Sequence, residues 1–402
     1  MRGTRIAISL FFFCDGLLLG SWAARIPAVQ AHAGLNNAQL GLALFASSLG
    51  ALAAMPVAGW LSERAGSRRV VMSALVVASV ALVFASLATD LVGVALALFA
   101  FGAGFGSVNV SANAQGIALE RAYGRPILSS FHAAFSVGGL AGAGVGALAA
   151  GGGLAPRVHF AVLAVVVTLT CMVAGRRLLP PDVVESGRQR RLARPSRTLL
   201  ILGAAAFCTL LAEGSAADWS AVYLSQSVGV SAAVAALGYT AFSLAMATSR
   251  TLGDQLNRRF GPLALARAGG GIAAIGLAAG LATASAPVAL AGFTAMGAGL
   301  GVVVPILFRA AGSIPGISAS IGVATVSTIG WLGFLAGPPA IGFAAGAVGL
   351  RTALALVVLA TLTLVILTRG VAPSARQPDG AAPSGGRLRD REDDHVVVGL
   401  PS

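Results

Sequence analysis

The sequence predicts an all-α membrane protein with twelve transmembrane helices in two six-helix bundles, related by pseudo-two-fold symmetry. Three observations predict it: the composition, a series of apolar runs and an internal repeat. Of the 402 residues, 56% are hydrophobic and 10% are charged, and the mean hydropathy is +0.86. Soluble domains carry about 25% charged residues. The composition therefore excludes a soluble protein.

Apolar runs near the roughly 20 residues needed to cross a bilayer recur from end to end. Two longer polar stretches interrupt them, so we expect an N-terminal bundle over 1–178, a cytoplasmic linker over 179–198, a C-terminal bundle over 199–369 and a disordered cytoplasmic tail over 370–402. The expected spans are 6–27, 38–61, 69–88, 92–117, 128–151, 158–178, 199–224, 232–253, 263–284, 288–308, 318–344 and 350–368.

Arginine sets the expected orientation. Every basic residue is arginine, the net charge is +13, and the arginines gather in alternate short loops. Arg25, Arg157 and Arg351 are the exceptions. By the positive-inside rule, both termini should be cytoplasmic. A groove-lining basic patch is not indicated, so we expect no nucleic-acid partner.

Other motif classes are not found. Cys14, Cys171 and Cys208 each lie in an apolar run without metal-ligand spacing, and we expect them to be small core residues. Arg25 and Pro27 follow the first apolar run where a signal peptide would have a small-residue cleavage site, so we expect a retained helix. There is no P-loop, which argues against an ATP drive. We expect no cofactor and no metal.

Three segments of the first half resemble three segments of the second half, and the members of each pair are separated by about the same number of residues. Six-plus-six parallel repeats around a midplane site are a known transporter architecture. The paired segments are 59–66 with 253–261, 15–22 with 213–219, and 135–142 with 328–337.

The segment Gly59-Trp-Leu-Ser-Glu63-Arg64-Ala-Gly66-Ser-Arg68-Arg69 resembles the loop 2–3 signature of the major facilitator superfamily, with Glu63 where Asp is usual. The resemblance covers all twelve spans and implies that fold, in a transporter of the bacterial inner membrane that functions as a monomer. It is nearest to the fucose-permease-like branch, through segments 21–27, 113–116, 129–136 and 212–220.

One position departs from the branch. The resemblance implies an acid where this sequence has Asn109, and asparagine does not titrate. A proton carrier in that helix therefore cannot be carried over by analogy.

Two acids are the candidates for proton coupling. A charged side chain at the bilayer centre costs roughly 2.5–3.5 kcal/mol on insertion scales, so such a group marks a functional hypothesis. Asp15 and Glu213 occupy corresponding helices, and we expect both to face a central cavity. The alternative for Asp15 is a fixed bond to polar groups of the seventh span.

A polar wall is expected on spans four and five, because their polar and small residues recur at helical spacing. The alternative is tight helix packing, in which small residues let backbones approach and Asn or Ser bonds across helices. For His132 structural bonding is the first interpretation. The candidate cavity residues are Trp22, Asn109, Asn113, Gln115, His132, Ser136, Trp219 and Trp331.

Two further groups are candidates for conformational roles. Arg25 and Asp218 are expected nearer the outer surface, as a gate, a structural ion pair or solute contacts. The resemblance implies a cytoplasmic latch that stabilises one rocking state. Its residues are Gly59, Glu63, Arg64, Gly66, Arg68, Asp254 and Arg258.

The leading functional hypothesis is a secondary transporter that rocks two bundles about a midplane cavity, with proton-coupled uptake of a small polar, sugar-like solute. Proton-driven efflux of a metabolite or drug is the alternative. A polytopic lipid enzyme would need a metal-binding or acid-rich cluster, which we do not find, so we expect no enzyme. A receptor would need a soluble signalling domain, and the residues after Gly370 are too few and too polar.

Overall fold

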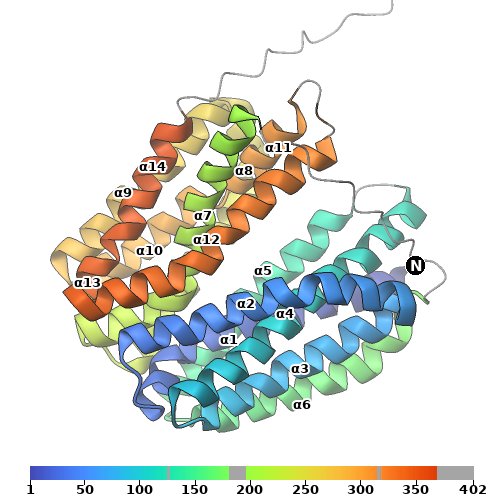
Figure 1. The fold of residues 1–402 in the computed structure, drawn as a ribbon, viewed down its shortest axis with the longest axis horizontal. Coiled ribbons are helices and arrows are strands. Elements are labelled where there is room, and N and C mark those ends of the chain that lie inside the picture. Colours follow the sequence, from blue (N-terminus) through green and yellow to red (C-terminus); the bar gives the residue numbers. More distant parts are fainter. Residues whose placement is uncertain (125–126, 181–195, 315–316, 318, 369–402) are drawn as a thin grey trace, which may run out of the picture. The chain divides into compact units, whose positions relative to one another are not determined.

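The computed structural model describes residues 1–124, 127–180, 196–314, 317 and 319–368. Within these ranges every regular element is a helix (Figure 1), which confirms the predicted all-α class. The expected tail over 370–402 and most of the expected linker over 179–198 lie outside the described residues.

Six long helices form the N-terminal half. They are α1 (Arg2–His32), α2 (Asn37–Leu61), α3 (Ser67–Leu87), α4 (Leu91–Tyr123), α5 (Leu128–Gly151) and α6 (Pro156–Ala174). Two short elements join this half: the π-helical turn η1 (Ser62–Gly66) and the 3-10 turn η2 (Gly175–Arg177).

The C-terminal half repeats the pattern with two of its helices interrupted. Its elements are α7 (Arg197–Tyr223), the π-helical turn η4 (Leu224–Val228), α8 (Ala232–Phe260), α9 (Pro262–Thr283), α10 (Ala286–Leu300), α11 (Val303–Gly312), α12 (Ala319–Val348), α13 (Leu350–Ala353) and α14 (Ala355–Leu367). The expected span 288–308 is thus α10 followed by α11, and 350–368 is α13 followed by α14.

Eleven continuous segments of the described chain are long and apolar enough to cross a membrane. The longest, Asn37–Leu87, has 51 residues and contains both α2 and α3, joined through η1. Gly66 has a φ of 86° directly before α3, and a side chain there would be strained. Twelve crossings therefore follow, as predicted.

Local signals in the sequence explain several helix boundaries. Asn36 and Gln39 form a capping box at the start of α2. The Asp90 carboxylate accepts from the Gly93 amide at 2.7 Å and caps α4. The Glu120 carboxylate accepts from the amides of Ile127 and Leu128, at 2.7 and 2.8 Å, and so satisfies donors at the start of α5.

Small residues set the close packing inside the N-terminal half. A Cβ on Gly16 or Gly20 of α1 would overlap backbone carbonyl oxygens of α5 at Phe135 or Gly139. Such contacts let two transmembrane helices approach to backbone distance. The glycine-rich sequence of α5 is therefore used for packing.

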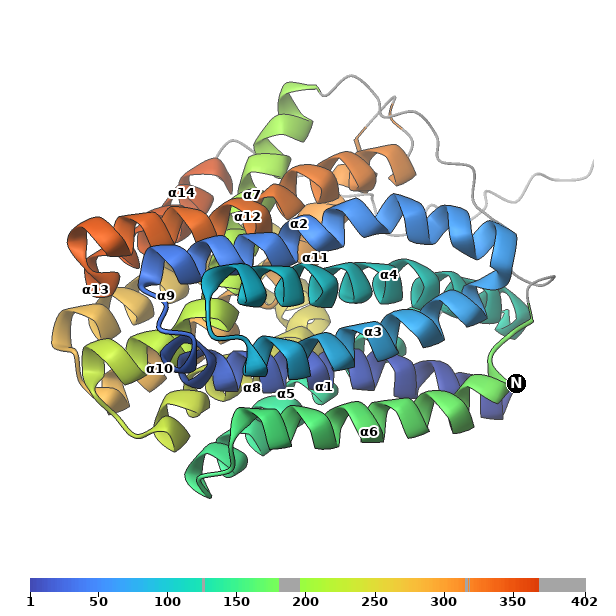
Figure 2. The same cartoon turned by 60° about the horizontal axis from the view of Figure 1, so that its bottom comes forward.

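The two halves meet mainly through α2 against α12 and α5 against α8; α2 and α12 run side by side in both views (Figure 1, Figure 2). We call the end with the N-terminus and the turns at Arg64, Arg121 and Arg258 the arginine-rich end, and the opposite end the arginine-poor end.

The contacts that join the halves lie toward the arginine-poor end. Gln226 of η4 donates to Gln30 of α1 at 2.9 Å. A Cβ on Gly342 of α12 would come within 2.8 Å of the Gly41 Cα of α2. The structure is therefore a state that is closed at the arginine-poor end.

Candidate functional site

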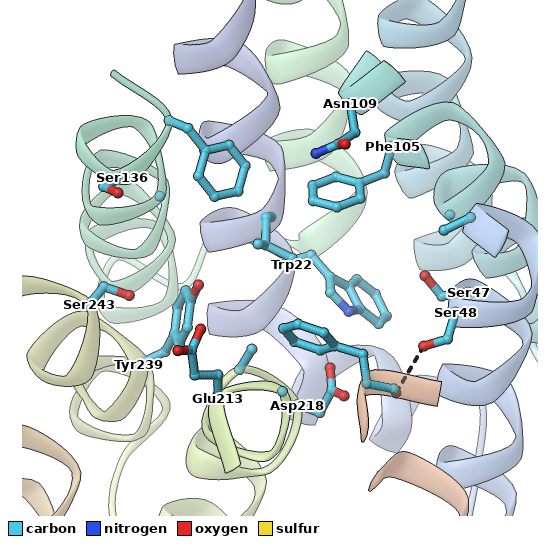
Figure 3. A pocket seen from close by; sticks show the side chains of 18 of the residues that line it. Trp22, Ser47, Ser48, Phe105, Asn109, Ser136, Glu213, Asp218, Tyr239 and Ser243 are labelled. Atoms are coloured by element: carbon cyan, nitrogen blue, oxygen red, sulfur yellow. Dashed lines mark hydrogen bonds between the residues drawn. The ribbon is translucent and has the colours of Figure 1, made fainter. Parts of the chain in front are cut away.

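A cavity of about 280 Å³ lies between the two halves and is lined by 25 residues (Figure 3). They come from the middle parts of α1, α2, α4 and α5 in one half and of α7, α8 and α12 in the other. A site at the interface of two repeats, at mid-depth of the helices, is where transporters of this architecture bind solutes.

Aromatic rings are concentrated in this cavity. Aromatic residues make up 6% of the chain but eight of the 25 lining positions. The rings of Phe105 and Phe135 are 6.1 Å apart, and those of Trp331 and Phe334 are 5.4 Å apart. Of the three tryptophans expected in the cavity, Trp22 and Trp331 line it and Trp219 does not. The eight are Trp22, Phe101, Phe105, Phe135, Tyr239, Phe242, Trp331 and Phe334.

All charged residues of the cavity wall belong to the C-terminal half: Glu213, Asp218 and Arg250. The Arg250 Nη2 lies 3.4 Å from the Glu213 Oε2, and the two side chains are 38% and 11% exposed. Arg250 also donates through Nε to the Gly301 carbonyl at 3.3 Å. The second carboxylate oxygen of Glu213, Oε1, is buried and has no hydrogen-bond partner.

Asp218 lies five residues after Glu213 on α7 and lines the same cavity. No hydrogen bond or ion pair joins its carboxylate to another residue that the structure describes. The expected pair with Arg25 is not formed: Arg25 donates to the Leu154 carbonyl, in the turn between α5 and α6. Arg25 is 3% exposed, so in this state it is a buried link within its own half.

The N-terminal half contributes polar but uncharged groups to the wall. Asn109, expected in the cavity, lines it together with Ser47, Ser48 and Ser136. Ser48 donates to the Phe334 carbonyl at 3.2 Å, and Ser136 to the His132 carbonyl at 3.2 Å. The Asn109 amide is therefore the largest polar group that this half offers to a solute.

Asp15 does not line the cavity, although it lies on the same face of α1 as two residues that do. Leu19 and Trp22 follow it by four and seven residues and line the wall. Asp15 itself is 3% exposed, and its Oδ1 is buried without a partner. The expectation that it faces the central cavity does not hold in this state.

The rings of Phe105 and Phe135 belong to the part of the cavity wall near Asp15. Helix α5 packs against α1 at the level of Gly16. The backbone carbonyl oxygen of Phe135 occupies the position that a Cβ on Gly16 would take. The Phe135 ring meets that of Phe105, and both rings line the cavity. Phe135 thus contributes a ring to the cavity wall beside the turn of α1 that carries Asp15.

Four residues expected in the cavity lie elsewhere. Gln115 is 1% exposed and bonds Ser67 and the backbone of Leu179 at 2.8–3.1 Å, which ties α3 and α4 to the chain after α6. The Asn113 amide donates to the Asn109 carbonyl at 2.7 Å. His132 packs edge-on against Phe12 at 5.2 Å, in line with structural bonding. Trp219 is fully buried, with its indole nitrogen unpartnered.

The expected latch lies around η1. Arg64 stacks on the Trp60 ring at 4.4 Å, while Glu63 and Arg258 are exposed. A Cβ on Gly59 would meet open space. Asp254 is in α8, but its side chain is outside the described residues. The latch stays a prediction.

Among the cavity residues that the sequence analysis did not name, Tyr239 and Arg250 carry the most chemistry. Arg250 falls within the expected span 232–253, where an ionisable residue is itself a signal of function. Tyr239 lies beside Glu213, with Ser243 close by (Figure 3). An ionisable residue inside an apolar span was thus the signal that could have found this cluster.

The three cysteines lie outside the cavity wall. Cys14, Cys171 and Cys208 are free and buried, as expected of small core residues. Over the ranges that the structure describes, no group of His, Cys, Asp or Glu is arranged to hold a metal ion.

Two bundles of apolar helices around a central cavity define the class as a polytopic membrane transporter. The chain belongs to the Major Facilitator Superfamily, whose family model matches residues 7–315. Family and relatives indicate a transporter of small solutes, not an enzyme.

The chain is 36% identical over 367 residues to an "uncharacterized MFS-type transporter" of Yersinia pestis, covering 91% of this chain and 95% of that protein. It is 34% identical over 359 residues to the membrane protein MosC of Rhizobium meliloti, covering 88% and 87%.

Solved structures agree with the fold. A mutant of the nucleoside transporter NupG superposes with a TM-score of 0.77 at 9% identity, over 92% of this chain and 100% of that one. A bacterial homologue of the human lysosomal transporter Spinster, in an inward-facing and occupied conformation, gives 0.70 at 19% identity, over 90% and 94%. At these identities the likeness concerns the fold alone.

Proposed function

We propose that the protein is a secondary active transporter that moves a small polar, ring-bearing solute by rocking its two halves about the central cavity, coupled to protons. The observation that carries this is the cavity itself: about 280 Å³ between the two halves, with described contacts between the halves at Gln30–Gln226 and Gly41–Gly342 toward the arginine-poor end. A solute can be exposed to alternate sides only if such contacts break and re-form at the other end.

The solute class follows from the wall. Rings of Trp22 and Trp331 can stack on the flat face of a solute ring. Asn109, Tyr239 and the carboxylates of Glu213 and Asp218 can bond its hydroxyl or amine groups. The volume suits one small ring system and is below the usual range of pockets for drug-sized ligands. These features support a small polar solute with a ring, either sugar-like or bearing an amine.

Proton coupling is assigned to Glu213 and Asp15. Each has a carboxyl oxygen that is buried without a hydrogen-bond donor, and an uncompensated charge there is costly. A proton bound to Glu213 would weaken its pair with Arg250 and change the cavity wall. Asp15 is buried in this state, and we infer that it exchanges a proton with water in another state of the cycle, in which the Phe105–Phe135 pair has parted.

Efflux is the second candidate, because one observation favours it. Eight aromatic residues line the cavity, and such walls also suit amphiphilic metabolites and drugs. The arginine-rich loops support an inner-membrane orientation with cytoplasmic termini, and in that orientation the present state opens toward the cytoplasm. That state occurs in the cycle of an importer and of an exporter.

The first experiment is a thermal-shift screen of the purified protein against sugars, nucleosides, amino acids, amines and common drugs. A compound that binds the folded state raises the melting temperature by mass action. The best compound is then followed in vesicles with and without an imposed proton gradient. Accumulation that needs the gradient is expected. Equilibration that ignores the gradient would contradict coupling and leave a facilitator.

A further inference from the structure

The charges of the cavity wall do not balance. The wall carries two carboxylates and one guanidinium, and the N-terminal half adds no charge. The guanidinium of Arg250 lies at Glu213, 3.4 Å from its carboxylate. Asp218 therefore remains as a cavity carboxylate for which the described chain supplies no cation and no donor.

Asp218 shares its cavity with several aromatic side chains. Trp22, Trp331 and Phe334 line the same cavity, and the Trp331 and Phe334 rings are 5.4 Å apart. Figure 3 shows the carboxylate of Asp218 on the same side of the cavity as the Trp22 indole and Ser48. Ser48 cannot serve Asp218 as a donor here, because its hydroxyl donates to the Phe334 carbonyl at 3.2 Å.

An unpaired carboxylate among ring faces suits one chemical group better than others. A protonated amine supplies both the missing positive charge and several N–H donors. Ring faces attract the same cation through their quadrupoles, most strongly at tryptophan. A neutral hydroxyl group can donate to Asp218 but leaves its charge uncompensated in a cavity wall of low polarity.

We propose that the solute is a small organic cation, whose protonated amine binds Asp218 among the rings of Trp22, Trp331 and Phe334. The proposal rests on the transport function above and names the solute class within it. The Glu213–Arg250 pair then faces the uncharged part of the solute, where Tyr239 and Ser243 supply hydroxyl groups.

The test uses amine and alcohol pairs of matched shape at neutral pH: glucosamine with glucose, 2-phenylethylamine with 2-phenylethanol, and tryptamine with tryptophol. The full-length purified protein is titrated with each compound, and the melting temperature is followed. At least one amine should stabilise the protein at a concentration about tenfold or more below that of its alcohol, because a charge-assisted bond is the stronger one.

Variants assign the effect to Asp218. Asp218→Asn should abolish the amine's advantage over its alcohol, and Asp218→Glu should keep part of it. Asp90→Asn is the matched control, since it makes the same chemical change at an exposed helix cap away from the cavity. The melting temperature of each variant without ligand shows whether it is folded.

Three results would overturn the proposal: no amine stabilises the protein, alcohols stabilise it equally well, or Asp218→Asn binds amines unchanged. The third result would indicate that Asp218 binds a proton and does not bind the solute. If alcohols bind as well as amines and are transported, the amine proposal is wrong but the transport function is still supported. Failure of every screened compound to be transported would count against the transport function itself.

Discussion

Asp15 and Glu213 occupy corresponding places on the first helix of each half, and their surroundings differ. Asp15 of α1 is 3% exposed and does not line the cavity. Glu213 of α7 faces the cavity, and one of its oxygens lies 3.4 Å from Arg250. The sequence repeat thus places the two acids at equivalent positions in the fold, but the groups around their carboxylates differ. The C-terminal half holds the charges of the cavity, and the N-terminal half holds a sealed carboxyl group.

The tryptophans of the two repeats differ for a geometrical reason. Trp22 follows Asp15 by seven residues, about 20° short of two full turns, so both share a face. Trp219 follows Glu213 by six residues and points about 120° away from it. Trp22 accordingly lines the cavity, whereas Trp219 is fully buried.

The largest effect is expected from breaking the charged pair of the C-terminal half. Glu213→Gln should lower the transport rate about tenfold to a hundredfold, because truncating one partner of a buried charge pair costs roughly 2–5 kcal/mol and Arg250 is partly exposed. Vesicle transport of the solute found in the screen measures it. Asp90→Asn, the same change of a carboxylate to an amide at an exposed helix cap away from the cavity, is the control. Equal losses in both variants would refute a special role for this pair.

A second prediction concerns the contact between the halves. Gly342→Ala should slow transport about fivefold to tenfold, because its Cβ would come within 2.8 Å of the Gly41 Cα and hold α2 and α12 apart. Gly346→Ala is the matched control, since its Cβ would make an ordinary contact with Ala38 at 3.5 Å. Cross-linking of Gln30→Cys to Gln226→Cys by a short thiol reagent reports closure. Unchanged cross-linking in Gly342→Ala would contradict the prediction.

The seal over Asp15 gives a third prediction. In a chain whose native cysteines are replaced by alanine, Asp15→Cys should react slowly with a water-soluble thiol reagent. Adding Phe135→Ala should raise the reaction rate about tenfold, since the ring pair with Phe105 is lost. Phe242→Ala removes a ring from the opposite wall and should leave the rate unchanged. A fast reaction of Asp15→Cys with both phenylalanines intact would contradict the prediction, because it would show that position 15 is accessible to water.

The smallest effect separates the two tryptophans. Trp22→Phe should weaken solute binding about threefold to tenfold, as a stacking face is reduced. Trp219→Phe should change binding less than about twofold, because this ring is buried away from the cavity. Titration of the melting temperature measures both. Similar losses in the two variants would place Trp219 in the binding step.

The fold was predictable from the sequence because apolar runs of membrane length and arginine in alternate loops act locally. Positions such as Trp22, Asn109 and Ser136 followed from helical spacing on the correct face. Gln115 did not, because its side chain bonds the chain near Leu179, 64 residues away. Arg250 was missed for a similar reason: its pairing with Glu213 depends on how α7 packs against α8, which spacing within one helix does not contain.

The most direct test of the account compares Asp15→Asn with Glu213→Gln in vesicles, with solute exchange and solute-induced pH change measured on the same preparations. Exchange needs the cavity and the rocking motion, whereas the pH change also needs the proton carrier. Asp15→Asn should keep exchange within about threefold of the unmodified protein and lose the pH change, while Glu213→Gln should lose both. An unchanged pH change in Asp15→Asn, or full exchange in Glu213→Gln, would contradict the division of roles between the two halves.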